Sequence, residues 1–170
     1  MPTTSDAIVV AAVAGGGGAS AAVDLWTRRV PNPLTLGIAA LGVTLAATDV
    51  SGVSVTGSCA GFALGLLLML PGHLIGATGA GDVKLFAAVG TLLGPTRTGM
   101  AFLYTAIAGG VLAVVIAVQR RRLRETMERA ATLVRTGGAN VTDIENASVD
   151  NRFAYAPAIA IGALAAALGF

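Results

Sequence analysis

The chain has 170 residues, of which 55% are hydrophobic and only 12% are charged, and its mean hydropathy is +0.79. A soluble domain carries about 25% charged residues, so this composition argues against a soluble fold and predicts an integral membrane protein. The single cysteine, Cys59, excludes an internal disulfide and a cysteine-rich zinc site, and we expect its thiol to be buried as a small hydrophobic group.

Charge-poor apolar runs lie at about 7–23, 33–48, 53–71, 83–94, 98–118 and 153–170. Most have the length of a membrane-spanning helix, whereas the fourth is short and could instead be re-entrant or half-buried. Asp6, and no Lys or Arg, precedes the first run, which favours a retained helix over a cleaved signal peptide. The predicted fold is an all-α polytopic bundle of about six transmembrane helices, forming one membrane-embedded domain over residues 1–170.

The basic residues are distributed unevenly between the two sides of such a bundle. With the N-terminus outside and six crossings, ten of the eleven face the cytoplasm and only Arg97 lies outside. The ten are Arg28, Arg29, Lys84, Arg120, Arg121, Arg122, Arg124, Arg129, Arg135 and Arg152. This asymmetry follows the positive-inside rule and predicts a multi-pass protein of the cytoplasmic membrane. It also favours contact with the lipid bilayer over binding of nucleic acid.

The cytoplasmic loop 119–152 is the one long polar segment. Within it, apolar residues recur at helical spacing among arginines, which is typical of an amphipathic helix lying on the inner leaflet. A solvated basic loop without a catalytic part is the alternative interpretation.

Two carboxylates stand apart from the other acidic residues. Asp24 ends the first apolar run and Asp82 opens the fourth, and the predicted topology brings both to the cytoplasmic face. Carboxylates near membrane depth are costly, so a functional role is a reasonable default. Two carboxylates that share one proton can act as base and acid toward a water that attacks a peptide carbonyl, without a metal or another cofactor.

Other chemistries are less compatible with the sequence. Gly76 and Gly81 have the spacing of a phosphate-binding loop, but Asp82 replaces the lysine and would repel phosphate. The single histidine, His73, is expected in a short cytoplasmic turn, and no His-Glu-x-x-His motif exists. The glycines before Asp82 are expected to let the backbone bend and an extended substrate approach.

At these residues the chain resembles the type IV prepilin peptidase family, membrane aspartyl proteases of the Gly-x-Gly-Asp type. The similar blocks are "DLWTRRVPNPLT" (24–35), "GATGAGDVKLFAAVG" (76–90) and "FAYAPAIAIGAL" (153–164). The resemblance implies that Asp24 and Asp82 are the catalytic pair, which cleaves the leader from prepilin-like precursors at the cytoplasmic face. The other residues that match motif positions, and that the resemblance implies shape the site, are Pro31, Asn32, Gly79, Gly81, Lys84, Tyr155 and Pro157.

Larger members of that family carry two Cys-x-x-Cys pairs and also N-methylate the new terminus. This chain lacks those pairs and therefore resembles the small, peptidase-only branch that serves Tad-type (Flp) or related pili. Methylation is not expected.

Several alternatives stay open from the sequence. Pro31 and Asn32 could simply turn the chain and cap the second helix. Lys84 could only anchor a helix end among headgroups, and Tyr155 could be an interfacial aromatic residue. At the level of function, the alternatives are a non-enzymatic assembly or transport component with a proton- or ion-binding aspartate pair, and a protease for preflagellin-like precursors.

Helix polarity leads to one further hypothesis. Asp24 is expected at a helix C-terminus, which disfavours negative charge, and Asp82 at a helix N-terminus, which favours it. Asp24 would then hold the shared proton and Asp82 would be the base.

Overall fold

The computed structural model describes residues 4–76, 78–119, 131 and 155–170. The helices are α1 (Thr4–Thr27), α2 (Asn32–Ala47), α3 (Val55–Leu74), α4 (Ala80–Gln119) and α7 (Ala156–Leu168), and the described residues contain no strand. Three of these helices, α1, α3 and α4, are long and apolar enough to cross a membrane, and α2 and α7 are shorter apolar helices. The all-α fold is thus confirmed, while six crossings stay a prediction. The amphipathic helix predicted within 119–152 lies outside the described residues.

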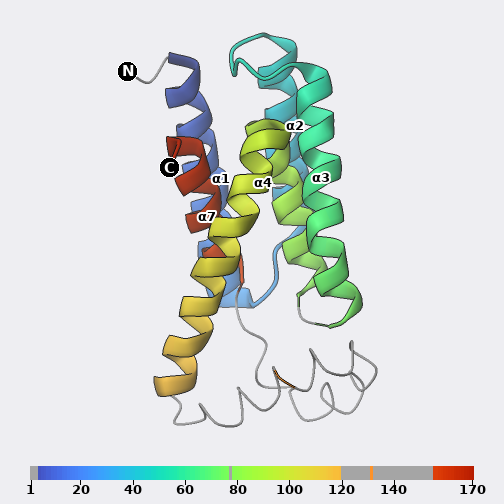
Figure 1. The fold of residues 1–170 in the computed structure, drawn as a ribbon. Coiled ribbons are helices and arrows are strands. Elements are labelled where there is room, and N and C mark those ends of the chain that lie inside the picture. Colours follow the sequence, from blue (N-terminus) through green and yellow to red (C-terminus); the bar gives the residue numbers. More distant parts are fainter. Residues whose placement is uncertain (1–3, 77, 120–130, 132–154) are drawn as a thin grey trace.

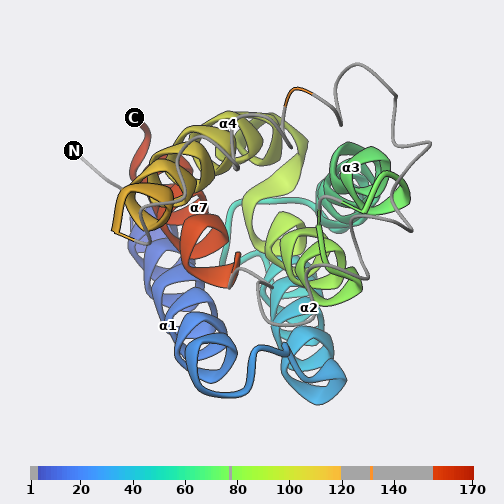
Figure 2. The same ribbon diagram turned by 90° about the horizontal axis from the view of Figure 1, so that it is seen from below.

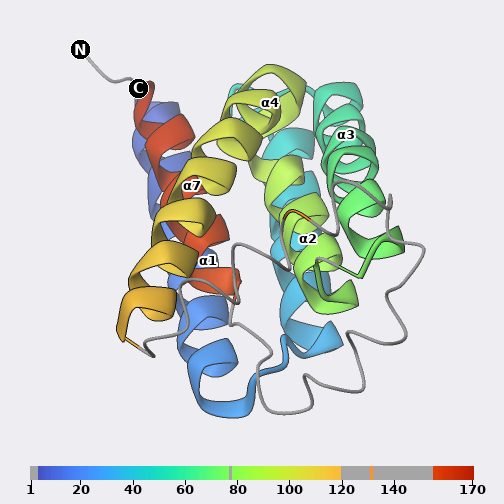
Figure 3. The ribbon, with the colours of Figure 1, turned by 60° about the horizontal axis from the view of Figure 1, so that its bottom comes forward.

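The fourth and fifth predicted runs form the two arms of α4, which bends sharply at Gly94. Gly94 has φ +71° and ψ 173°, a backbone conformation that is essentially restricted to glycine, and Pro95 follows it. The first arm, residues 80–94, and the second arm, residues 95–119, therefore run in opposite directions (Figures 1 and 3).

The first arm of α4 lies at the centre of the bundle. Every residue from 85 to 94 is buried, including Phe86 and Leu92. Buried on all sides, this arm shows no amphipathic pattern, which explains why its run appeared short but continuously apolar. Seen along the bundle, α2, α3 and the first arm group together, and α1, α7 and the second arm form the other group (Figure 2).

Small residues bring these helices close together. A Cβ placed on Gly61 of α3 would lie 2.1 Å from the carbonyl oxygen of Gly90, and one on Gly162 of α7 would lie 2.2 Å from Oγ1 of Thr105. Such contacts between small residues are how membrane helices associate, and they account for many of the 23 glycines.

Two expectations about single side chains are wrong. Cys59 is exposed, because the buried face of α3 consists of Ser58, Gly61, Gly65 and Met69 and the thiol points away from it. His73 lies within helix α3, in its last turn, and not in a loop between helices. Its Nδ1 hydrogen-bonds the carbonyl oxygen of Thr78 at 3.0 Å.

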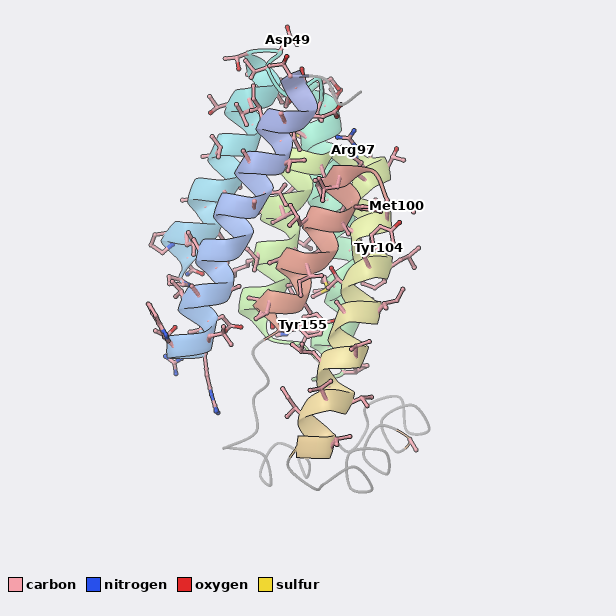
Figure 4. All side chains as sticks on the ribbon, turned by 90° about the vertical axis from the view of Figure 1, so that its left-hand side faces the viewer. Asp49, Arg97, Met100, Tyr104 and Tyr155 are labelled. Atoms are coloured by element: carbon pink, nitrogen blue, oxygen red, sulfur yellow. The ribbon has the colours of Figure 1, made fainter. Side chains whose placement is uncertain are left out.

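The ends of the bundle separate the charged residues much as the topology predicted. Arg97 forms an ion pair with Asp6 at 2.8 Å, and Asp49 lies toward the same end, with Tyr155 toward the other (Figure 4). Asp24 is 18 residues after Asp6 in α1, which corresponds to roughly 27 Å along a helix. This ion pair and Asp24 therefore lie near opposite ends of the bundle.

Candidate active site

Asp24 continues the buried face of α1. The buried residues of this helix are Val9, Val13, Gly17, Ser20 and Asp24, at intervals of three or four, so the helical period turns the carboxylate inward. Asp24 is 5% exposed, and its Oδ2 accepts a hydrogen bond from the backbone N–H of Ala156 at 3.2 Å. Asp24 lies in the last turn of α1, which ends at Thr27, so its expected place at a helix C-terminus is confirmed.

Asp82 is the third residue of α4 and bonds back to the residue before the helix. The N–H of Gly79 donates to Oδ2 of Asp82 at 3.2 Å, and the carbonyl of Gly79 accepts from the N–H groups of Asp82 and Val83. This reciprocal arrangement resembles a capping box, with Asp in place of Glu. Asp82 is 9% exposed. Its carboxylate thus has a structural function at the start of α4 whatever its chemical role.

Asp24 bonds to the start of α7, Asp82 lies close enough to interact electrostatically with Asp24 and Tyr155, and we call the two carboxylates the aspartate pair. Asp24 accepts from Ala156, the first residue of α7, and the negative charge of Asp24 acts on Asp82. Tyr155, the residue before α7, is half-buried and lies close enough to Asp82 for the two groups to interact electrostatically. Residues from α1, α4 and the start of α7 are thereby brought together.

This arrangement removes the premise of the proton assignment based on helix polarity. Asp24 does lie in the last turn of α1, but its carboxylate also faces the positive end of the α7 dipole. Asp82 faces the positive end of its own helix. Since both carboxylates accept from a helix N-terminus, helix polarity does not determine which one holds a shared proton.

The glycines before Asp82 have different roles from one another. A Cβ on Gly79 would lie 3.0 Å from Oδ2 of Asp82, so this glycine leaves room for the carboxylate. A Cβ on Gly81 would make an ordinary contact, 3.4 Å from Cβ of Val30. The bend expected here occurs at Gly76, which has φ +72°. Close approach of a substrate to these glycines stays a prediction.

Lys84, Asn32 and Pro31 join the starts of two helices. Nζ of Lys84 donates to Oδ1 of Asn32 at 3.1 Å, which links the N-terminal part of α4 to the first residue of α2. Pro31 is the N-cap residue of α2, and its carbonyl accepts from the N–H groups of Leu34 and Thr35. The capping alternative is therefore correct for the backbone of Pro31, whereas the side chain of Asn32 bonds to Lys84.

Tyr155 and Pro157 start α7. The carbonyl of Tyr155 accepts from the N–H groups of Ala158 and Ile159, and Pro157 lies in the first turn, where a proline sacrifices no hydrogen bond. The side chain of Tyr155 is half-buried. Among the residues that the structure describes, no three His, Cys, Asp or Glu side chains are grouped as metal ligands would be.

Comparison with known protein families shows which family the chain belongs to. The model of the type IV leader peptidase family matches residues 11–114, more than half of the chain, including Asp24 and Asp82. The chain belongs to the type IV leader peptidase family. Neither the comparison with curated proteins nor the one with solved structures found a match.

Family membership and the long apolar helices together indicate a membrane peptidase. The matched region ends within the second arm of α4, so it does not include Tyr155, Ala156 or Pro157. The structure nevertheless brings the start of α7 to both carboxylates.

Two residues at the start of α7 and beside it, Ala156 and Gly109, were not among the predicted site residues. Ala156 contributes through its backbone N–H, and only Pro157 marks the start of a helix there. Gly109 contacts the ring of Tyr155, but within the pair Gly109–Gly110 nothing in the sequence distinguishes one glycine from the other.

Proposed function

We propose that this protein is a membrane aspartyl endopeptidase that removes the leader peptide of type IV prepilin-like precursors at the cytoplasmic face. Asp24 and Asp82 are its catalytic residues. The observation that supports this most directly is the burial of two carboxylates that interact electrostatically although they are 58 positions apart in the sequence, in a chain of the leader peptidase family.

The aspartate pair suits peptide hydrolysis because two neighbouring carboxylates share one proton more readily than they hold two charges. One carboxylate accepts a proton from water as the water oxygen bonds to the carbonyl carbon of the scissile bond, while the other donates its proton to the carbonyl oxygen, which gives a tetrahedral intermediate. The C–N bond then breaks, and the first carboxylate passes its proton to the leaving amine. A hydroxyl of the tetrahedral intermediate returns one proton to the second carboxylate, which restores the starting state.

The residues around the pair are proposed to shape the site. Gly79 has no side chain and so leaves space for the Asp82 carboxylate. The Lys84–Asn32 hydrogen bond keeps the starts of α4 and α2 together. Gly81 lets Val30, in the connection between α1 and α2, pack against the start of α4, and the carbonyl of Pro31 caps α2. Tyr155 and Pro157 start the helix whose N–H group holds Asp24.

The biological setting is proposed from the sequence and the family. One domain over residues 1–170 spans the cytoplasmic membrane about six times, with the N-terminus outside. Since the sequence contains a single cysteine, it fits a peptidase-only branch that serves Tad-type (Flp) pili, without N-methylation. Its partners are then prepilin-like precursors and the lipid bilayer.

The test compares three Asp→Asn variants in membranes that contain a co-expressed type IV prepilin. Asp24→Asn and Asp82→Asn each remove one proton-transfer group, and we expect cleavage to fall at least about 100-fold. Asp49→Asn is the matched control, because Asp49 is exposed between α2 and α3, and Asn tolerates its φ of +55° equally well. The shortened prepilin is measured on a gel.

If both variants still shorten the precursor, the protease proposal is wrong. A membrane component with a proton- or ion-binding pair gives a different result: no cleavage by the unmodified protein, and a pH-dependent flux that Asp24→Asn and Asp82→Asn abolish.

A further inference from the structure

The ring of Tyr155 occupies the space that a side chain at Gly109 would need. A Cβ built on Gly109 would lie 2.6 Å from Cε2 of Tyr155 and 2.8 Å from its hydroxyl oxygen. Gly109 is buried in the second arm of α4, 27 positions after Asp82. Only glycine leaves the ring this close to the helix backbone.

The position of Tyr155 bears on both members of the aspartate pair. Its neighbour Ala156 donates the N–H that binds Asp24, and the charge of Asp82 acts on its phenol. Tyr155 is also the N-cap residue of α7, so a shift of its backbone moves the first turn of that helix. A displacement of the ring is therefore transmitted to the surroundings of Asp24 and Asp82.

We propose that Gly109 is a positioning residue of the peptidase: by lacking a side chain, it seats Tyr155 so that the start of α7 holds the aspartate pair in its working geometry. This inference rests on the proposed function, but its physical part, the seating of Tyr155, can be tested without any substrate.

The expected effect follows from the contact distances. Non-bonded carbon atoms are at their optimum about 3.5–4.0 Å apart, so a methyl group on Gly109 must displace the ring by about 1 Å or more. Misplacement of about 1 Å at an active site can reduce a rate about 100-fold. We expect this loss of cleavage in Gly109→Ala.

Gly110 offers a matched control. It is the next residue of the same helix, it is exposed, and a Cβ placed there meets nothing within 4 Å. Gly109→Ala and Gly110→Ala gain the same intrinsic helix propensity. Any difference between them therefore reports the contact with Tyr155. We expect Gly110→Ala to cleave like the unmodified protein.

A double-mutant cycle separates positioning from misfolding. Tyr155→Ala removes the ring and leaves space for the methyl group of Gly109→Ala. In the Tyr155→Ala background, Gly109→Ala should change the residual cleavage less than about twofold, because the ring through which it acts is absent. The proposal would be overturned if the losses of cleavage caused by Tyr155→Ala and Gly109→Ala multiplied in the double variant. It would also be overturned if Gly109→Ala cleaved like Gly110→Ala.

The seating of Tyr155 has a spectroscopic readout of its own. In a Tyr104→Phe background Tyr155 is the one remaining tyrosine, so a change in the tyrosine bands of the near-ultraviolet circular dichroism reports its ring. Gly109→Ala should change these bands because the methyl group displaces the ring, while Gly110→Ala should leave them unchanged.

Tyrosine bands that Gly109→Ala leaves unchanged would refute the seating itself. Failure of the unmodified protein to cleave any prepilin would instead refute the proposed function, and the circular dichroism would still decide whether Gly109 seats Tyr155.

Discussion

The crossing of α3 and the first arm of α4 makes a quantitative prediction about stability. A Cβ on Gly61 would lie 2.1 Å from the carbonyl oxygen of Gly90, and a Cβ on Gly90 would lie 2.3 Å from that of Gly61. Both obstructing atoms belong to the backbone, so no side chain can rotate to make room. Gly61→Ala must force the two helices apart.

The magnitude follows from the separation that this requires. Ordinary contact begins at 3.4 Å, so the helices must separate locally by more than about 1 Å. Overpacking of a tight interface costs about 1–3 kcal/mol, and we expect the upper end of that range because the backbone cannot yield. The gain in helix propensity, about 1 kcal/mol, opposes this loss.

Gly37→Ala is the matched control in α2. Gly37 is exposed, and a Cβ placed there meets nothing within 4 Å, so the variant should keep only the propensity gain. The free energies of unfolding of the two variants should therefore differ by about 3 kcal/mol. The assay is unfolding of the purified protein in mixed micelles, titrated with a denaturing detergent and followed by circular dichroism.

A Gly61→Ala protein no less stable than Gly37→Ala would contradict this prediction. The backbones of α3 and α4 could then not be in direct contact at Gly61 and Gly90. Because this contact fixes the helix that bears Asp82, we also expect Gly61→Ala to reduce precursor cleavage.

Two further substitutions test the bend of α4 and the link between helix starts. Gly94→Ala places a side chain at φ +71° and ψ 173°, and should destabilise the protein by about 1–3 kcal/mol. The control, Gly99→Ala, lies about one turn later and meets open space, so it should not destabilise the protein. Equal unfolding midpoints of the two variants would contradict the bend. Lys84→Met and Asn32→Ala each remove one partner of an exposed hydrogen bond, so each should lower the free energy of unfolding by at most about 1 kcal/mol. In the double variant the two losses should not add. Full additivity would show that the two side chains do not interact.

Much of the site could be predicted from the sequence because it depends on local periodicity. The helical period places Asp24 on the same face as Val13 and Gly17, and the glycine before α4 together with Asp82 three positions later marks a helix start. The apolar runs likewise predicted most of the helices. Their ends were less accurate, since α1 continues past Asp24 and α3 continues to Leu74, beyond Pro71.

The sequence alone thus determined the helical membrane fold and the two carboxylates, each at one end of an apolar segment. The tertiary structure decided which groups surround them. The N–H of Ala156 reaches Asp24 across 132 positions, and Lys84 reaches Asn32 across 52. Helical periodicity relates residues only three or four apart, whereas these contacts depend on how closely glycine-lined helices cross. For the same reason the seat of Tyr155 on Gly109, and the α7 dipole that faces Asp24, became visible only once the helices were packed.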